Sequence, residues 1–188
     1  MSHLSHHIVF VIPPTAMQIV FDSVIDALVE NNFELEETPF HSILLSDIDT
    51  DDRADYLFEE TWLEPETKAA QEKAVKKLRN HRTGGLINVR GIKAKFDGLP
   101  PYDVSVAFDS LDNQTIEYIS ICARNYIYDP HQTTFDAIIK SVIKRSTIIG
   151  IAQGLDAPHD WADEEIAEII KAGKLNELHP ELVYQREL

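Results

Sequence analysis

The sequence lacks most of the features by which a class of protein is recognised from residues alone. It has a single cysteine, Cys122, which excludes a disulfide framework within the chain and is typical of a reducing compartment. Its early apolar run, Ile8 to Ile12, is too short for a secretory signal or a membrane span. We therefore expect a cytoplasmic protein that does not enter a membrane. No internal repeat or reaction motif is present.

Positive charge is also scarce, and it is unevenly distributed. The 188 residues hold 17 lysines and arginines against 32 aspartates and glutamates, a net charge of -15. Residues 1–65 carry 14 acids and only one cation, Arg53, whereas residues 66–96 carry nine cations and two acids. A basic island therefore lies within an acidic chain. Because a strongly acidic chain repels nucleic acid, we expect no nucleic-acid partner.

The remaining composition is that of an ordinary globular protein, with 44% hydrophobic and 26% charged residues. We predict a single α+β domain over residues 1–173 and a C-terminal tail over 174–188. Its mixed or antiparallel sheet has four to six strands, packed by two long apolar helices at 16–31 and 133–153.

Apolar spacing and turn residues locate the other elements. Strands are predicted at 7–12, 33–45, 86–96, 102–109 and 115–127, and the second of these is interrupted at Pro39. Further helices are predicted at 65–80 and after Asp160. The short connections after residue 85 favour an antiparallel meander. Two segments are ambiguous. Residues 46–64 are expected to begin as a loop and become helical near Arg53, and the helix from 133 has an alternative in which it ends near Arg145 and a strand follows.

The stretch "SDIDTDDRADYLFEE" at 46–60 has the aspartate spacing of a calcium loop but not its other requirements. With Asp47 at position 1, the glycine needed at position 6 is Asp52, and the bidentate glutamate needed at position 12 is Phe58. We therefore expect no specific metal site here, and no cofactor elsewhere. The stretch is either a solvated turn or a surface that binds a basic partner.

For the second interpretation, acids interleaved with aromatic residues are the composition of an interface anchor, although they also suit a helix packed on the core. The candidate partner-binding residues are Asp47, Asp49, Asp51, Asp52, Asp55, Tyr56, Glu59, Glu60 and Trp62.

The basic island offers an alternative site, for an anion. Its candidate residues are Lys73, Lys76, Lys77, Arg79, His81 and Arg82. The glycines Gly84 and Gly85 follow the predicted helix instead of opening it, so the helix N-terminus that favours phosphate is missing. An exposed helix whose cations offset neighbouring acids is the simpler interpretation.

Neither the cysteine nor the histidines predict catalysis. Alternation in "IEYISICARNYIY" places Ile119, Ile121 and Ala123 on one face and Tyr118, Ser120 and Cys122 on the other, and no sequence feature supplies a base for the thiol. The residues His3, His6 and His7 are expected in a frayed terminus. Turn chemistry and helix capping account for His131 and His159.

These observations support three hypotheses about function. The leading one is a non-catalytic cytoplasmic binding protein whose acidic and aromatic surface engages a basic protein, as a bacterial immunity- or antitoxin-type neutraliser does. The second is a phosphate- or small-molecule-binding protein, or an enzyme, that uses the basic helix over 66–82. The third is a structural or oligomer-forming subunit, for instance a homodimer, suggested by the apolar character of the helix at 16–31.

Overall fold

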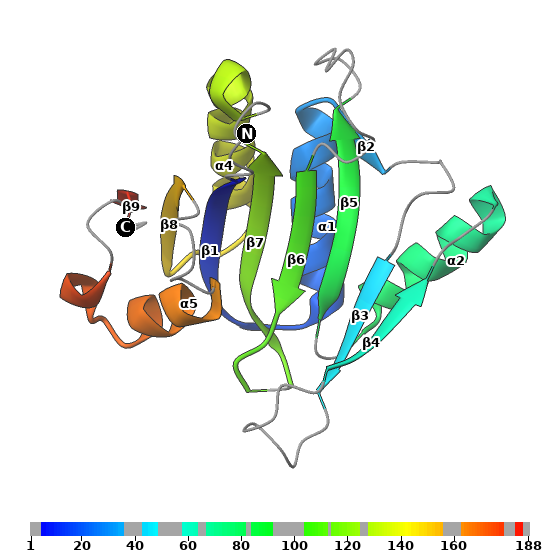
Figure 1. The fold of residues 1–188 in the computed structure, drawn as a ribbon, viewed down its shortest axis with the longest axis horizontal. Coiled ribbons are helices and arrows are strands. Elements are labelled where there is room, and N and C mark those ends of the chain that lie inside the picture. Colours follow the sequence, from blue (N-terminus) through cyan, green and yellow to red (C-terminus); the bar gives the residue numbers. More distant parts are fainter. Residues whose placement is uncertain are drawn as a thin grey trace.

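The computed structural model describes ten stretches of the chain. These are residues 5–35, 43–48, 58–63, 67–81, 84–91, 104–112, 114–124, 128–155, 163–178 and 183–185. They form one sheet with helices on both of its faces (Figure 1).

The sheet joins nine strands, and every pair of neighbours is antiparallel. The strands are β1 (Ser5–Thr15), β2 (Phe33–Leu35), β3 (Ile43–Ile48), β4 (Phe58–Leu63), β5 (Gly85–Gly91), β6 (Val104–Asp109), β7 (Ile116–Arg124), β8 (Gly150–Leu155) and β9 (Val183–Gln185). Their order is β4-β3-β5-β6-β7-β1-β8-β9, and β2 pairs with β5 beside β3. The predicted α+β class and the meander β5-β6-β7 are confirmed, with more strands than the four to six expected.

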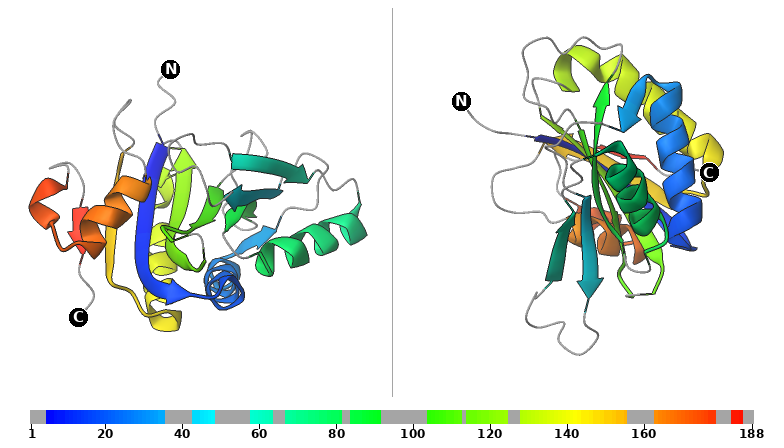
Figure 2. Two further views of the ribbon diagram at one scale, coloured as in Figure 1. Left: turned by 90° about the horizontal axis from the view of Figure 1, so that it is seen from below. Right: turned by 90° about the vertical axis from the view of Figure 1, so that its right-hand side faces the viewer.

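Helices supply the second and third layers. They are α1 (Met17–Glu30), α2 (Lys68–Arg79), α4 (Gln132–Arg145) and α5 (Asp163–Lys171), with short 3-10 turns η1 (Asp129–His131) and η2 (Leu175–Glu177). Helices α1 and α4 cover one face of the sheet and α5 covers the other (Figures 1 and 2). No helix in the described stretches is both long and apolar enough to cross a membrane.

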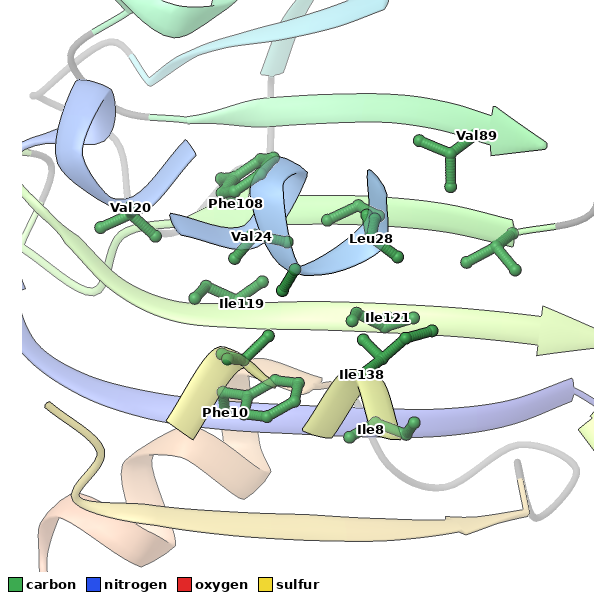
Figure 3. Close-up of a cluster of buried hydrophobic side chains, with 14 of the residues drawn as sticks. Ile8, Phe10, Val20, Val24, Leu28, Val89, Phe108, Ile119, Ile121 and Ile138 are labelled. Atoms are coloured by element: carbon green, nitrogen blue, oxygen red, sulfur yellow. The ribbon is translucent and has the colours of Figure 1, made fainter. Parts of the chain in front are cut away.

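Alternation along the central strands divides side chains between the two faces. In β1, Ile8 and Phe10 belong to the larger core beneath α1 and α4, whereas Val9 and Val11 belong to the smaller cluster beneath α5. Figure 3 shows the larger core, in which Val24 of α1 meets side chains of the sheet. A strand that is apolar on both faces is buried on both, which explains why β1 lies in the interior of the sheet.

The favoured long helix over 133–153 is wrong, and the alternative is closer to the structure. Helix α4 ends at Arg145, Ser146 is extended, and β8 begins at Gly150. The backbone N–H of Ile149 donates to the Val11 carbonyl at 2.7 Å, and β8 pairs with β1 along its length. Pairing with a central strand therefore outweighs the apolar spacing that suggested a helix, as the β-branched residues here favour.

One further expectation is wrong. Residues 58–63 of the acidic stretch form strand β4, not a helix, and pair with β3 in a regular register. Residues 49–57, including Arg53, lie outside the described residues. The segment 33–45, predicted as strand-like with an interruption at Pro39, contains β2 and the start of β3. Pro39 lies outside the described residues. Within the predicted tail, β9 adds to the sheet beside β8.

Candidate functional site

Four of the nine residues of the predicted acidic surface lie in the paired strands β3 and β4. Of its residues, Asp47 lies in β3, and Glu59, Glu60 and Trp62 lie in β4. The other five, Asp49, Asp51, Asp52, Asp55 and Tyr56, lie outside the described residues. The register pairs Asp47 with Glu59. Two acidic positions therefore stand directly opposite each other in this hairpin.

The hairpin lies at one end of the strand order. Strand β3 pairs with both β4 and β5, while β4 has no second neighbour among the described strands. Figure 1 shows β4 at the edge of the sheet opposite to β9. The outer edge of β4 therefore carries backbone N–H and C=O groups of the kind that can pair with an added strand.

The predicted anion-binding residues that the structure describes lie on α2 or just after it. On α2, Lys73, Lys76 and Lys77 are exposed. The guanidinium of Arg79 instead forms two hydrogen bonds with the Asp22 carboxylate of α1, at 2.7 and 2.5 Å. Residue His81 accepts a hydrogen bond from the Gly84 backbone N–H through Nδ1.

Arg82 lies outside the described residues. The bidentate ion pair between Arg79 and Asp22 joins α2 to α1, so the Arg79 guanidinium already binds a carboxylate of the protein itself. This arrangement weakens the anion hypothesis, because one of its cations has a structural role.

A group that the sequence did not predict lies on the face of the sheet covered by α5. The register places His7 of β1 directly opposite Cys122 of β7. Their side chains are in contact, with the Cys122 Sγ 3.5 Å from the His7 Nε2. On the other side of the ring, His7 Nδ1 lies 3.1 and 3.3 Å from the two carboxylate oxygens of Asp163.

The carboxylate of Asp163 is held from two directions. The Nδ1 of His7 on β1 contacts its Oδ1, and the Ser120 hydroxyl of β7 donates a hydrogen bond to its Oδ2. Side-chain exposure is 25% for His7 and 23% for Asp163. The site is therefore a row of three groups in contact, a thiol on β7, an imidazole on β1 and a carboxylate on α5. It is partly accessible to solvent.

Helix α5 brings Asp163 to this position. Its apolar residues Ile166, Ala167 and Ile170 are buried against Val9 and Val11 of β1. Asp163 is the first residue of the helix, a place that the helix macrodipole favours for a carboxylate.

The last residue of α5, Lys171, forms an ion pair with Glu117 of β7. The Glu117 side chain is only 3% exposed, and its carboxylate also accepts from the Leu111 backbone N–H at 2.9 Å. Polar contacts at both ends and apolar contacts between them therefore fix α5 over the sheet.

The electrostatics of this face are unusual for a sheet surface. Burial by itself would lower the pKa of His7, but its hydrogen bonds to Asp163 and Cys122, together with their charges, raise it to about 10. Further along the same face, burial raises the pKa of Asp109 to about 6, and the carboxylates of Glu164 and Asp163 act in the same direction. His7 is therefore cationic at neutral pH, beside the thiol.

The expectation that His7 lies in a frayed terminus is wrong, because β1 begins at Ser5 and is paired on both sides. The structure therefore places an imidazole beside Cys122, which no sequence feature indicated. The predicted alternation around Cys122 is confirmed: Ile119 and Ile121 are in the larger core, and Tyr118 is in the cluster beneath α5. Extending the alternation to Ile8–Ile12 would have placed His7 on the opposite face from Ile8, but not beside Cys122.

Among the described residues, no three His, Cys, Asp or Glu side chains are arranged to hold a metal ion. His131 lies in η1 at the start of α4, and His159 lies outside the described residues.

Comparison with known proteins yields little. No protein family and no curated protein matches this sequence. A solved structure described as Pseudomonas aeruginosa T6SS protein PA0821 is similar, with 11% identity and a TM-score of 0.39. The match covers 90% of this chain and 45% of that chain.

Proposed function

We propose that this protein binds a basic protein partner through the acidic hairpin of β3 and β4. The observation that carries the proposal is the position of this hairpin. The most acidic segment of the chain ends in a strand that has no second neighbour among the described strands. Such an edge offers backbone groups for pairing and carboxylates for charge complementarity.

Charge supports the same partner. Residues 46–60 contain seven acids and one cation, so they attract basic proteins and repel nucleic acid. The strand register places the acidic residues Asp47 and Glu59 at opposite positions, so the acids of this hairpin come from both of its strands.

The biological role that best suits this charge distribution is that of a cytoplasmic immunity- or antitoxin-type neutraliser, which occupies a basic surface of another protein. Binding of this kind relies on electrostatic steering and on complementary backbone edges. It requires no cofactor.

The test uses a defined probe. A synthetic peptide of alternating lysine and valine, which favours an extended strand, is titrated into the full chain by calorimetry at low and moderate salt. A peptide of the same length and charge, in which a central valine is replaced by proline, serves as its control, because proline removes a backbone donor and is excluded from the interior of paired strands. We expect binding of the first peptide only, with an affinity that falls as salt rises.

The matched protein variants neutralise equal charge at two places. The hairpin variant carries Asp47→Asn, Glu59→Gln and Glu60→Gln. The control variant carries Asp136→Asn, Glu165→Gln and Glu168→Gln, which are exposed acids on α4 and α5. Exposed ion pairs contribute about 0.2–1 kcal/mol each, so the hairpin variant is expected to lose about 1.5 kcal/mol, roughly ten-fold in Kd. Equal affinities of the two variants would contradict the proposal.

A further inference from the structure

The group of Cys122, His7 and Asp163 has the order of parts found where a thiol acts as a nucleophile. Such a site needs a nucleophile within hydrogen-bond reach of a base, and a third group that orients the base. Here different ring nitrogens of His7 face the two other groups, Nε2 toward Cys122 and Nδ1 toward Asp163. We propose that these three residues form a nucleophilic thiol site that accepts an acyl group from an activated ester or thioester.

The surroundings of Cys122 differ from those of a packed core cysteine. On its face of the sheet, its cross-strand neighbours are His7 on β1 and Ser105 on β6, and the strand beyond β1 contributes Gly154. The apolar cluster beneath α5 begins one row further along, at Val9. Cys122 is partly exposed. It therefore lies in a row of small and polar side chains, next to a charged ring.

The site is separate from the proposed partner-binding hairpin. Strands β5 and β6 lie between β7 and β3 in the sheet, so substitutions at one site do not contact the other. The acyl-accepting site is therefore independent of the proposed binding of a basic protein, and it can be tested without a protein partner.

The proposed step balances as an acyl transfer. The Cys122 sulfur attacks the carbonyl carbon of the donor, and a carbon–sulfur bond forms. The bond from that carbon to the leaving oxygen or sulfur breaks. Because His7 is already protonated at neutral pH, the thiol proton leaves to water. The protonated His7 Nε2 gives its proton to the leaving group and takes one back from water, so the products are an S-acyl cysteine and an alcohol or thiol. Asp163 is a positioning residue, because it contacts the His7 ring and not the thiol.

A structural explanation of the same contacts is that Asp163 and His7 only anchor the start of α5 to the sheet. That explanation requires no special reactivity at Cys122. The two explanations therefore differ in the rate at which the thiol reacts and in whether that rate depends on His7.

The experiment treats the full chain with p-nitrophenyl acetate, and in a second arm with S-phenyl thioacetate. Release of the leaving group is followed by absorbance, and the acylated residue is identified by peptide mass spectrometry. We expect one equivalent of leaving group per chain and an acetyl group on Cys122, at a rate at least about ten-fold above that of glutathione at pH 7. Cys122→Ala is expected to abolish this phase. Reaction with only one donor assigns the class of leaving group.

Variants distinguish the roles. His7→Gln is expected to lower the acylation rate by on the order of 100-fold, the lower end of what a general acid–base group contributes. Asp163→Asn is expected to give an intermediate rate that rises more steeply with pH than the wild-type rate, and Asp163→Glu to restore part of the loss. Ser105→Ala, a cross-strand neighbour of Cys122 on β6, is the control and is expected to react as the wild type does.

Circular dichroism establishes that each variant is folded. If His7→Gln does not fold, the comparison of the wild type with glutathione decides the question. A wild-type thiol that reacts no faster than glutathione would overturn the proposal. So would a folded His7→Gln variant that reacts at the wild-type rate, or acylation that persists in Cys122→Ala.

Discussion

The ion pair between Lys171 and Glu117 offers a sharp test of how α5 is held. The Glu117 side chain is 3% exposed, whereas that of Lys171 is 29% exposed. Replacing Lys171 by Met keeps much of the aliphatic stem but leaves a buried carboxylate without its cation. Breaking a buried ion pair by removing one partner costs about 3–5 kcal/mol. Because water reaches the lysine end and Leu111 still donates to the carboxylate, we expect the low end, about 3 kcal/mol.

The assay is urea unfolding followed by circular dichroism, with a thermal scan as a second measure. For a chain of this size, about 3 kcal/mol corresponds to a fall in Tm of about 6–12 °C. The control is Lys174→Met, because Lys174 pairs with Glu177 at 3.6 Å and both side chains are largely exposed. That change is expected to cost less than about 0.5 kcal/mol.

A second substitution identifies the cause. In the double variant Lys171→Met with Glu117→Gln, the buried group is neutral, so we expect the free energy of unfolding to recover by more than about 1 kcal/mol. The reasoning is refuted if Lys171→Met costs no more than Lys174→Met. It is also refuted if Glu117→Gln gives no recovery, because the cost would then arise from lost packing and not from an unpaired charge.

Two further outcomes follow from single residues. Burial raises the pKa of Asp109 from 3.8 to about 6, so the folded state favours the neutral carboxyl group. The contribution of this neutral group to the free energy of unfolding is fully present below pH 3.8 and is lost as the pH rises through 6. Asp109→Asn is therefore expected to raise the free energy of unfolding at pH 7.5 by up to about 3 kcal/mol but hardly at pH 4, and a gain that is the same at both values in urea titrations would contradict this. Gly84 has φ of +126°, and a Cβ there would lie 2.0 Å from the Phe108 carbonyl oxygen. Gly84→Ala is expected to cost more than about 2 kcal/mol, and a thermal scan showing an unchanged Tm would exclude the strain.

The sequence was sufficient for local elements. Helix α1 and the meander β5-β6-β7 were predicted because apolar spacing and turn residues specify them within short windows. The alternation around Cys122 was predicted for the same reason. Charge counts locate the acidic and basic segments in the sequence. The hydrogen bond from Arg79 to Asp22 joins residues 57 positions apart, so no short window of the sequence predicts it.

Long-range pairing set the limits. The contact of Cys122 with His7 depends on pairing between β1 and β7 across 115 positions, and that of His7 with Asp163 on α5 packing across 156. No periodicity in either segment encodes such a register. The same cause explains the error at 133–153, where pairing of β8 with β1 outweighs helical spacing.

The central claim, that the β3–β4 hairpin binds a basic partner along its outer strand, is tested most directly by hydrogen exchange. Deuterium uptake of the full chain is measured by mass spectrometry with and without the alternating lysine–valine peptide at low salt. If the peptide pairs with the edge, amide exchange slows in Phe58–Leu63 more than elsewhere, and the protection is lost at moderate salt and in the hairpin variant. Bound peptide with unchanged exchange in Phe58–Leu63 would contradict the account.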